Sequence, residues 1–85
     1  MKAIWVVIQP AAYRDLKALD QRTKKRIFTV LDDFADGKRV DLKKLQGNAD
    51  QWRIRTGDYR IILDIVLLDN VAYVVRVGHR REVYR

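Results

Sequence analysis

The chain contains no cysteine and only one histidine among its 85 residues. Without cysteine it can form neither a disulfide nor a thiolate metal site, so a reducing cytoplasm is the expected compartment. One histidine cannot hold a metal ion alone, and no carboxylate cluster stands near it at ligand spacing. The sequence therefore predicts no metal site and no cofactor.

Long apolar runs are also missing. No stretch approaches the about 18–20 apolar residues that a membrane-spanning helix needs, so we expect no membrane partner. The apolar start, residues 1–8, is too short for a signal peptide and leads into Gln9-Pro10 rather than a small-residue cleavage site. Because repeats, low-complexity segments and linkers are absent, the sequence predicts one small domain over residues 1–85.

Negative charge is scarce, since 11 acidic residues face 18 basic ones and the formal net charge is +7. Such an excess predicts an anionic partner, namely nucleic acid, an acidic protein or a membrane surface. From Gln51 onward arginine replaces lysine completely. Because guanidinium groups bind phosphate through two parallel hydrogen bonds and stack on bases, this distribution favours RNA or DNA.

The first half of the chain predicts one strand and two helices. Residues 2–8 are rich in Val, Ile and Trp and indicate a strand that ends before Pro10, which suits the first position of a helix. Asp20 is the expected N-cap of a second helix, and Gly37 its C-terminal stop. The expected apolar faces are Ala12, Leu16 and Leu19 in the first helix and Ile27, Val30, Leu31 and Phe34 in the second.

Residues 38–50 predict a loop held by Leu42 and Leu45. Three strands are then expected at residues 51–56, 58–67 and 71–78, with Asp69-Asn70 turning the second into the third. This β-α-α-β-β-β order predicts an α+β domain. An N-terminal helical hairpin would pack on one face of a small, mainly antiparallel four-stranded sheet.

The segment Thr56-Gly57-Asp58-Tyr59 predicts a two-residue hairpin loop, with Gly57 in a type II′ turn. Arg55 then lies directly opposite Arg60, and period-two alternation places Arg53 on the same face. Like charges directly across a strand pair are destabilising. An anion that docks there would explain the cluster, whereas the alternative is a solvated face neutralised by nearby aspartates.

A two-residue loop at Asp69-Asn70 would place His79 opposite Arg60, on the face away from the helices. The C-terminal segment would bring Arg80 and Tyr84 to the same place. Together these side chains suit cleavage of RNA without a metal, because cations bind the scissile phosphate, an imidazole transfers protons and a ring stacks on a base. The 2′-OH of the substrate would be the nucleophile.

Four segments follow one another in a characteristic order. They are residues 44–47 (Lys-Leu-Gln-Gly), 52–55 (Trp-Arg-Ile-Arg), 57–62 (Gly-Asp-Tyr-Arg-Ile-Ile) and 76–85 (Arg-Val-Gly-His-Arg-Arg-Glu-Val-Tyr-Arg). In these segments the chain resembles the RelE toxins of the RelE/ParE toxin–antitoxin superfamily, and the agreement in length and element order extends the resemblance over essentially the whole chain. The resemblance implies a compact microbial-ribonuclease-like fold and cleavage of mRNA in the ribosomal A site. It also implies a RelB-like antitoxin that binds the toxin in a higher hetero-oligomer.

The resemblance also implies roles for single residues. Arg60 matches the family arginine that stabilises the transition state, Arg80 the arginine at the leaving group, and Tyr84 the tyrosine that stacks on the substrate base. Arg53 and Arg55 stand where some RelE enzymes carry paired lysines, one of which is a proposed general base. Because arginine stays protonated, both can hold phosphate but neither can accept the 2′-OH proton.

His79 is therefore the candidate base, since surrounding guanidinium groups disfavour its protonated form. The alternatives are a turn histidine that only hydrogen-bonds the backbone and a Tyr84 that only anchors the tail. The run Lys24-Lys25-Arg26 predicts a solvated helix face. We expect catalysis by Arg55, Arg60, His79, Arg80 and Tyr84, and binding of RNA phosphates by Arg53, Lys43, Lys44 and Arg81.

Two other functions fit the same sequence. A ParE-like protein would use this fold to inhibit DNA gyrase without cleaving RNA. A basic module could also bind RNA without catalysis. The arginine cluster and the C-terminal segment favour the ribonuclease.

Overall fold

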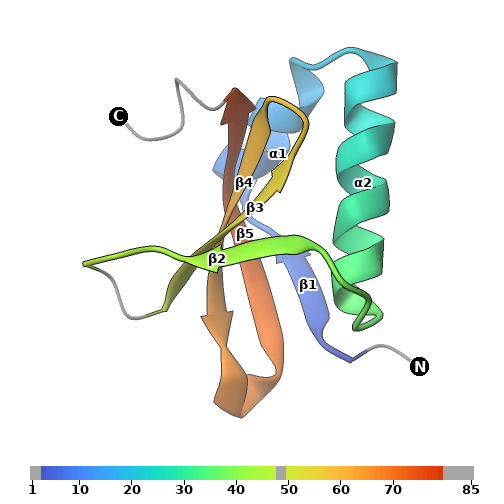
Figure 1. Ribbon diagram of the computed structural model, residues 1–85. Coiled ribbons are helices and arrows are strands. Elements are labelled where there is room, and N and C mark those ends of the chain that lie inside the picture. The colour runs from blue at the N-terminus through green and yellow to red at the C-terminus, as the bar shows by residue number, and fades with distance from the viewer. Residues whose placement is uncertain (1–2, 48–49, 80–85) are drawn as a thin grey trace.

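A computed structural model describes residues 3–47 and 50–79 of the chain (Figure 1). The strands form one five-stranded sheet in the order β1-β5-β4-β3-β2. β1 and β5 run parallel, and the other neighbours are antiparallel. Within these two ranges, no helix is both long and apolar enough to cross a membrane. The elements are β1 (Trp5–Ile8), α1 (Pro10–Lys17), α2 (Gln21–Ala35), β2 (Asp41–Lys44), β3 (Gln51–Thr56), β4 (Tyr59–Val66), the 3₁₀ helix η1 (Leu67–Asp69) and β5 (Val71–His79).

The predicted α+β architecture is confirmed, with five strands instead of four. The additional strand is β2, which lies in the segment predicted as a loop and pairs antiparallel with β3, Leu42 opposite Ile54. Asp and Lys are depleted in strands, so the local preference of this segment is weak. Pairing with the free edge of β3 supplies the stabilisation that the segment itself does not indicate.

The helix boundaries follow the predicted local signals. Pro10 is the first residue of α1. Asp20 caps α2, because its carboxylate accepts a hydrogen bond of 2.7 Å from the N–H of Thr23. Gly37 follows α2 with a φ of +81° and donates its N–H to the carbonyl of Phe34, which ends the helix.

The helices cover one face of the sheet and form the hydrophobic core with it. α1 contacts β5, whereas α2 contacts β1 and β3. The apolar faces predicted for both helices are confirmed, since Leu19, Val30 and Phe34 pack partly buried around four buried helical residues. The buried core is Ala12, Leu16, Ile27, Leu31, Ile54, Ile61, Leu63, Ile65, Ala72, Val74 and Val77.

The connection from β4 to β5 differs from the predicted two-residue turn. Leu67–Asp69 form η1, and Asn70 follows in the left-handed conformation with a φ of 54°. Within the strands, the register shifts between Ile62 and Leu63. The loop length and this irregularity together decide which residues of β4 and β5 face each other.

As a result, His79 lies opposite Tyr59, and Gly78 lies opposite Arg60. The expected pairing of Arg60 with His79 is therefore wrong by one residue. Because successive side chains of a strand point to opposite faces, this shift moves His79 to the helix-covered face.

Candidate functional site

The β3–β4 hairpin brings two arginines together. Arg55 lies directly opposite Arg60, as predicted from the two-residue loop. Gly57 has a φ of +58°, and Asn70 is the one non-glycine residue of the described ranges with positive φ, so Asp58 is not left-handed. This combination is that of a type II′ turn, whose twist matches the flanking strands.

Alternation along β3 places Arg53 and Arg55 on the sheet face away from the helices, while Ile54 between them packs in the core. β2 adds Asp41 opposite Arg55 and Lys43 opposite Arg53 on the same face. We define the arginine surface as the side chains that these pairings bring together, namely Asp41, Lys43, Arg53, Arg55 and Arg60.

Asp41 binds two of these arginines, a role that the sequence did not indicate. Arg53 donates from Nη1 to Asp41 Oδ1 at 2.9 Å and to the Asp41 carbonyl at 3.2 Å. Arg55 donates from Nε to Asp41 Oδ2 at 2.9 Å. The bond from Arg53, joined by that from Arg55, lowers the pKa of Asp41 below its usual value although burial opposes the shift. Asp41 therefore stays ionised and offsets part of the repulsion among the arginines.

The three arginines differ in what they offer a ligand. Arg53 is only 8% exposed, so its guanidinium serves Asp41 rather than the surface. The Arg55 side chain is 50% exposed and bonds Asp41 through Nε. Arg60 is half-buried and lies beside Gly78, which has no side chain to cover it. Arg55 and Arg60 are thus the two arginines of this surface whose side chains are not fully buried, although Arg60 Nε is shielded from solvent.

His79 does not join this pair. Its ring lies on the helix-covered face, edge-on to Tyr59 with ring centroids 5.9 Å apart and planes at 77°. Both rings line a hollow of about 420 Å³ at the end of α1, together with Leu19. The structure therefore does not place an imidazole beside Arg55 and Arg60, in contrast to the expectation from the sequence.

The other site residues predicted from the sequence do not all lie on the arginine surface. Lys43 belongs to the arginine surface, whereas Lys44 lies opposite Trp52 on the other face and borders a hollow of about 430 Å³ with Phe34. No group of side chains that could hold a metal ion occurs within residues 3–47 and 50–79. Three predicted site residues lie outside the described residues, namely Arg80, Arg81 and Tyr84.

A second carboxylate, Asp15 on α1, fixes the end of β5. It accepts hydrogen bonds from Arg76 Nε at 2.8 Å, from Arg76 Nη2 at 3.3 Å and from the Val77 N–H at 2.9 Å. Burial alone would raise the pKa of Asp15, but the hydrogen bonds and the charge of Arg76 outweigh it, so this pKa lies below its usual value. Arg76 thereby ties α1 to the sheet and is not part of the arginine surface.

Sequence signals for these two carboxylates differ. The alternation of polar and apolar residues in Val40-Asp41-Leu42-Lys43 would have indicated a strand and placed Asp41 on the same face as Lys43. Asp15 and Arg76 lie 61 positions apart, and no local pattern connects them.

Comparisons with known proteins agree with this fold. A sequence model of the ParE toxin of type II toxin–antitoxin system, parDE, matches residues 6–84. Toxin RelE3 of Methanocaldococcus jannaschii is 32% identical over 76 residues, which are 84% of this chain and 84% of that protein.

Solved structures of toxins from the same family are also similar to this chain. The RelB–RelE complex from Methanococcus jannaschii has a TM-score of 0.77 at 26% identity and covers 92% of this chain and 94% of that chain. The toxin–antitoxin complex RelBE2 from Mycobacterium tuberculosis has a TM-score of 0.75 at 27% identity and covers 96% and 97%. The isolated E. coli RelE toxin, at 23% identity and a TM-score of 0.78 over 96% and 92%, shares the fold. The chain therefore belongs to the RelE/ParE superfamily, as a RelE-like toxin of a type II toxin–antitoxin system.

Proposed function

We propose that this toxin is a ribosome-dependent endoribonuclease that cleaves mRNA in the ribosomal A site and so inhibits translation. The observation that carries the proposal is the placement of Arg55 directly opposite Arg60 on the face away from the helices. The arginine surface holds four cationic side chains and one carboxylate. Because like charges across a strand pair are destabilising, a phosphate bound there would stabilise the placement of Arg55 opposite Arg60.

The chemistry that suits this surface is transfer of a phosphoryl group within the RNA strand. The 2′-hydroxyl loses its proton as its oxygen forms a bond to phosphorus, and the 5′-oxygen gains a proton as its bond to phosphorus breaks, so the products carry a 2′,3′-cyclic phosphate and a 5′-hydroxyl. Arg55 and Arg60 would hold the phosphate and stabilise the additional negative charge of the transition state. Arg80 would serve the leaving group and Tyr84 would stack on a base, as the family resemblance implies.

His79 is not the base of this reaction in our proposal, because its ring lies on the opposite face from Arg55 and Arg60. Neither arginine can take the 2′-OH proton at neutral pH. The described part of the arginine surface thus contributes phosphate binding and charge stabilisation. Stabilisation of developing charge by groups held in place beforehand is usually what accelerates such reactions most.

The first test is Arg60→Ala in single-turnover cleavage of mRNA bound to ribosomes. Loss of one preorganised charge at the transition state should slow cleavage about 100- to 1000-fold, or about 2.7–4 kcal/mol. Arg39→Ala is the matched control, because Arg39 is exposed and lies in the loop after α2. Cleavage by Arg60→Ala at the parental rate would refute the assignment.

We further propose that a RelB-like antitoxin neutralises the toxin in a higher hetero-oligomer. Two solved relatives above 25% identity are RelE–RelB complexes, which supports a partner of this type. A formal charge of +7 also favours rapid association with an acidic partner. Because translation takes place in the cytoplasm, the proposal places the toxin there.

The second candidate function is inhibition of DNA gyrase without RNA cleavage. One observation favours it, since the family model that matches residues 6–84 describes the ParE toxin. The two functions share a fold and differ in the site. Primer extension on translated mRNA, run beside a supercoiling assay, separates them, because a gyrase inhibitor blocks supercoiling and leaves the message intact.

A further inference from the structure

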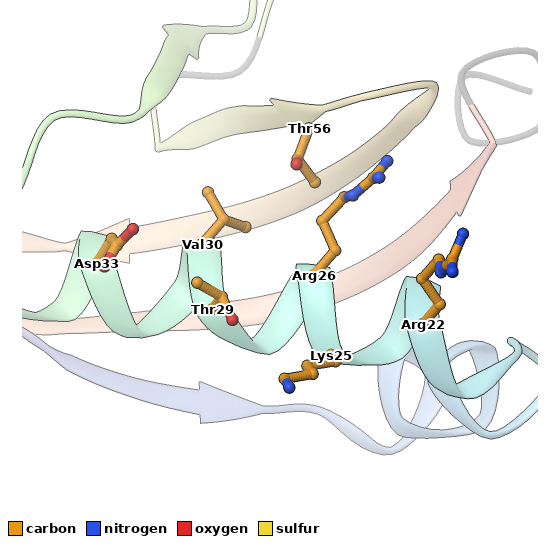
Figure 2. Close-up of a pocket in the computed structure, with 7 residues that line it drawn as sticks. All are labelled: Arg22, Lys25, Arg26, Thr29, Val30, Asp33 and Thr56. Carbon is orange, nitrogen blue, oxygen red and sulfur yellow. The ribbon is translucent and has the colours of Figure 1, made fainter.

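A cationic hollow lies on the helix side of the β3–β4 hairpin, away from the arginine surface. It has a volume of about 470 Å³ and lies between α2 and the last residue of β3 (Figure 2). Thr56, which precedes the hairpin loop, forms one wall. The lining residues are Arg22, Lys25, Arg26, Thr29, Val30, Asp33 and Thr56.

Two carboxylates lie near the three cations of this hollow. Asp33 is in its lining. The pKa of Asp20, the N-cap of α2, is lowered by its hydrogen bonds with Thr23 and also by the charges of Arg22 and Arg26. Within the described part of the chain, Arg22, Lys25 and Arg26 form neither a hydrogen bond nor an ion pair through their side chains. Asp33, in the lining, pairs with Lys38, which lies outside it, at 3.8 Å between Oδ1 and Nζ. Like charges four residues apart on a helix are mildly destabilising, so Arg22 and Arg26 repel each other when the hollow is empty.

Arg26 is held against the hairpin loop. A Cβ atom placed on Gly57 would lie 2.8 Å from Arg26 Nη1, so the guanidinium occupies the space that a side chain would fill. Figure 2 shows Arg26 directed across the hollow toward Thr56 and the hairpin, with Arg22 one turn away on the same helix. Gly57 thus serves two purposes, because the turn also requires its positive φ.

We propose that this hollow binds a backbone phosphate of RNA, on the other side of the hairpin tip from Arg55 and Arg60. The inference rests on the proposed function and adds a second contact for the same class of ligand. Two guanidinium groups supply forked donors that match phosphate oxygens. Thr29 and Thr56 add hydroxyl donors beside them.

The position at the hairpin tip favours RNA over a folded acidic protein. Arg55 and Gly57 are separated by one residue along the chain, so the cations of both surfaces approach a single turn from its two sides. A continuous chain of phosphates can pass over such a turn and contact both surfaces. Asp58 lies at the exposed tip, and the RNA strand must pass beside this acidic side chain.

The test compares Arg22→Gln/Arg26→Gln with Arg14→Gln/Arg39→Gln, which removes the same charge from exposed positions outside the hollow. The probe is a short fluorescein-labelled single-stranded RNA with 2′-O-methyl groups, which cannot undergo 2′-OH attack. Anisotropy gives the association constant over a range of KCl concentrations. Circular dichroism and thermal melting confirm that each variant is folded.

Each phosphate contact to single-stranded RNA contributes about 0.7 to the slope of log K against log salt concentration. Because the hollow is proposed to bind one phosphate, the variant in the hollow should lose about 0.7 in slope, which corresponds to about 5-fold weaker binding at 0.1 M salt. Arg22→Lys/Arg26→Lys should retain most of the slope, since the charge remains. An identical slope for the hollow variant and its charge-matched control would overturn the inference.

A labelled poly-glutamate peptide distinguishes the other class of ligand. If the hollow variant weakens binding of this peptide and leaves RNA binding unchanged, the hollow recognises an acidic protein and the inference is wrong. Cleavage of ribosome-bound mRNA by the parental toxin is measured separately. If the parental toxin does not cleave mRNA but the hollow variant shows the expected change in slope, the proposed function is wrong and the phosphate site is still supported.

Discussion

Asp15→Asn tests how strongly one carboxylate holds α1 on the sheet. The substitution keeps the shape of the side chain and removes its charge. Asp15 accepts hydrogen bonds from Arg76 and from the Val77 N–H, and its side chain is 20% exposed. Because Oδ2 accepts from both the Val77 N–H and Arg76 Nε, an asparagine oxygen at that place can keep both bonds without the charge, but its amide group would then present hydrogens to Arg76 Nη2.

The expected loss follows from the exposure of the partners. Hydrogen bonds to charged groups contribute about 1.5–3 kcal/mol, whereas exposed ion pairs contribute about 0–1 kcal/mol. The Arg76 side chain is 60% exposed, so its share belongs to the lower range. We expect a loss of about 2 kcal/mol in the free energy of unfolding, and a decrease in Tm of about 8–16 °C for a domain of this size.

The pH dependence provides the more specific readout. The pKa of Asp15 is lowered in the folded state, so its contribution is fully present above the ordinary value of about 3.9 and is lost as pH falls through the folded pKa. The difference between parental protein and Asp15→Asn should therefore be constant from neutral pH to about pH 5 and shrink below it. Chemical unfolding at neutral and acidic pH measures both values.

Asp32→Asn is the control, because Asp32 is exposed on α2 and forms no ion pair in the described ranges. Its stability should match that of the parental protein at neutral pH. Equal stability of Asp15→Asn and the parental protein at neutral pH would contradict the assignment of Asp15. A difference that stays the same on acidification would show that charge is not its cause.

Two further predictions follow from burial. Arg53→Gln should lower Tm more than Arg55→Gln and slow cleavage less, because Arg53 is 8% exposed and bound to Asp41. Melting curves and single-turnover cleavage measure the two effects. The reverse order would show that Arg53 contacts the ligand. Leu16→Ala should reduce the free energy of unfolding by about 2.7–5 kcal/mol through the cavity it leaves, since Leu16 is 2% exposed. Urea titration measures this loss. Tyr13→Ala, at a position that is 56% exposed on the same helix, should reduce the free energy of unfolding far less.

Features that depend on neighbouring residues were predictable from the sequence. The cap at Asp20, the helix stop at Gly37 and the register of Arg55 against Arg60 each depend on a few adjacent positions. In the hairpin, a two-residue loop leaves one register that matches the turn. The pairing of Arg55 with Arg60 was therefore predictable from the sequence alone.

Features that depend on distant partners were not predictable in this way. β2 forms because β3 offers an edge, and its own residues have weak strand preference. The position of His79 depends on a four-residue connection (residues 67–70) and on the irregularity between Ile62 and Leu63. A shift of one residue moves a side chain to the other face, so these small local differences separated the imidazole from the arginines.

The parallel pairing of β1 with β5 bears on when a growing polypeptide becomes harmful to its own cell. Trp5 pairs with Val71, so the first strand lacks its neighbour until 66 more residues have been synthesised. Such non-local pairing makes folding wait for late segments. A nascent chain therefore cannot complete the sheet on which Arg55 and Arg60 lie opposite each other. Under the proposed function, the ribosome that synthesises the toxin would not meet an active site until that round of synthesis is nearly complete.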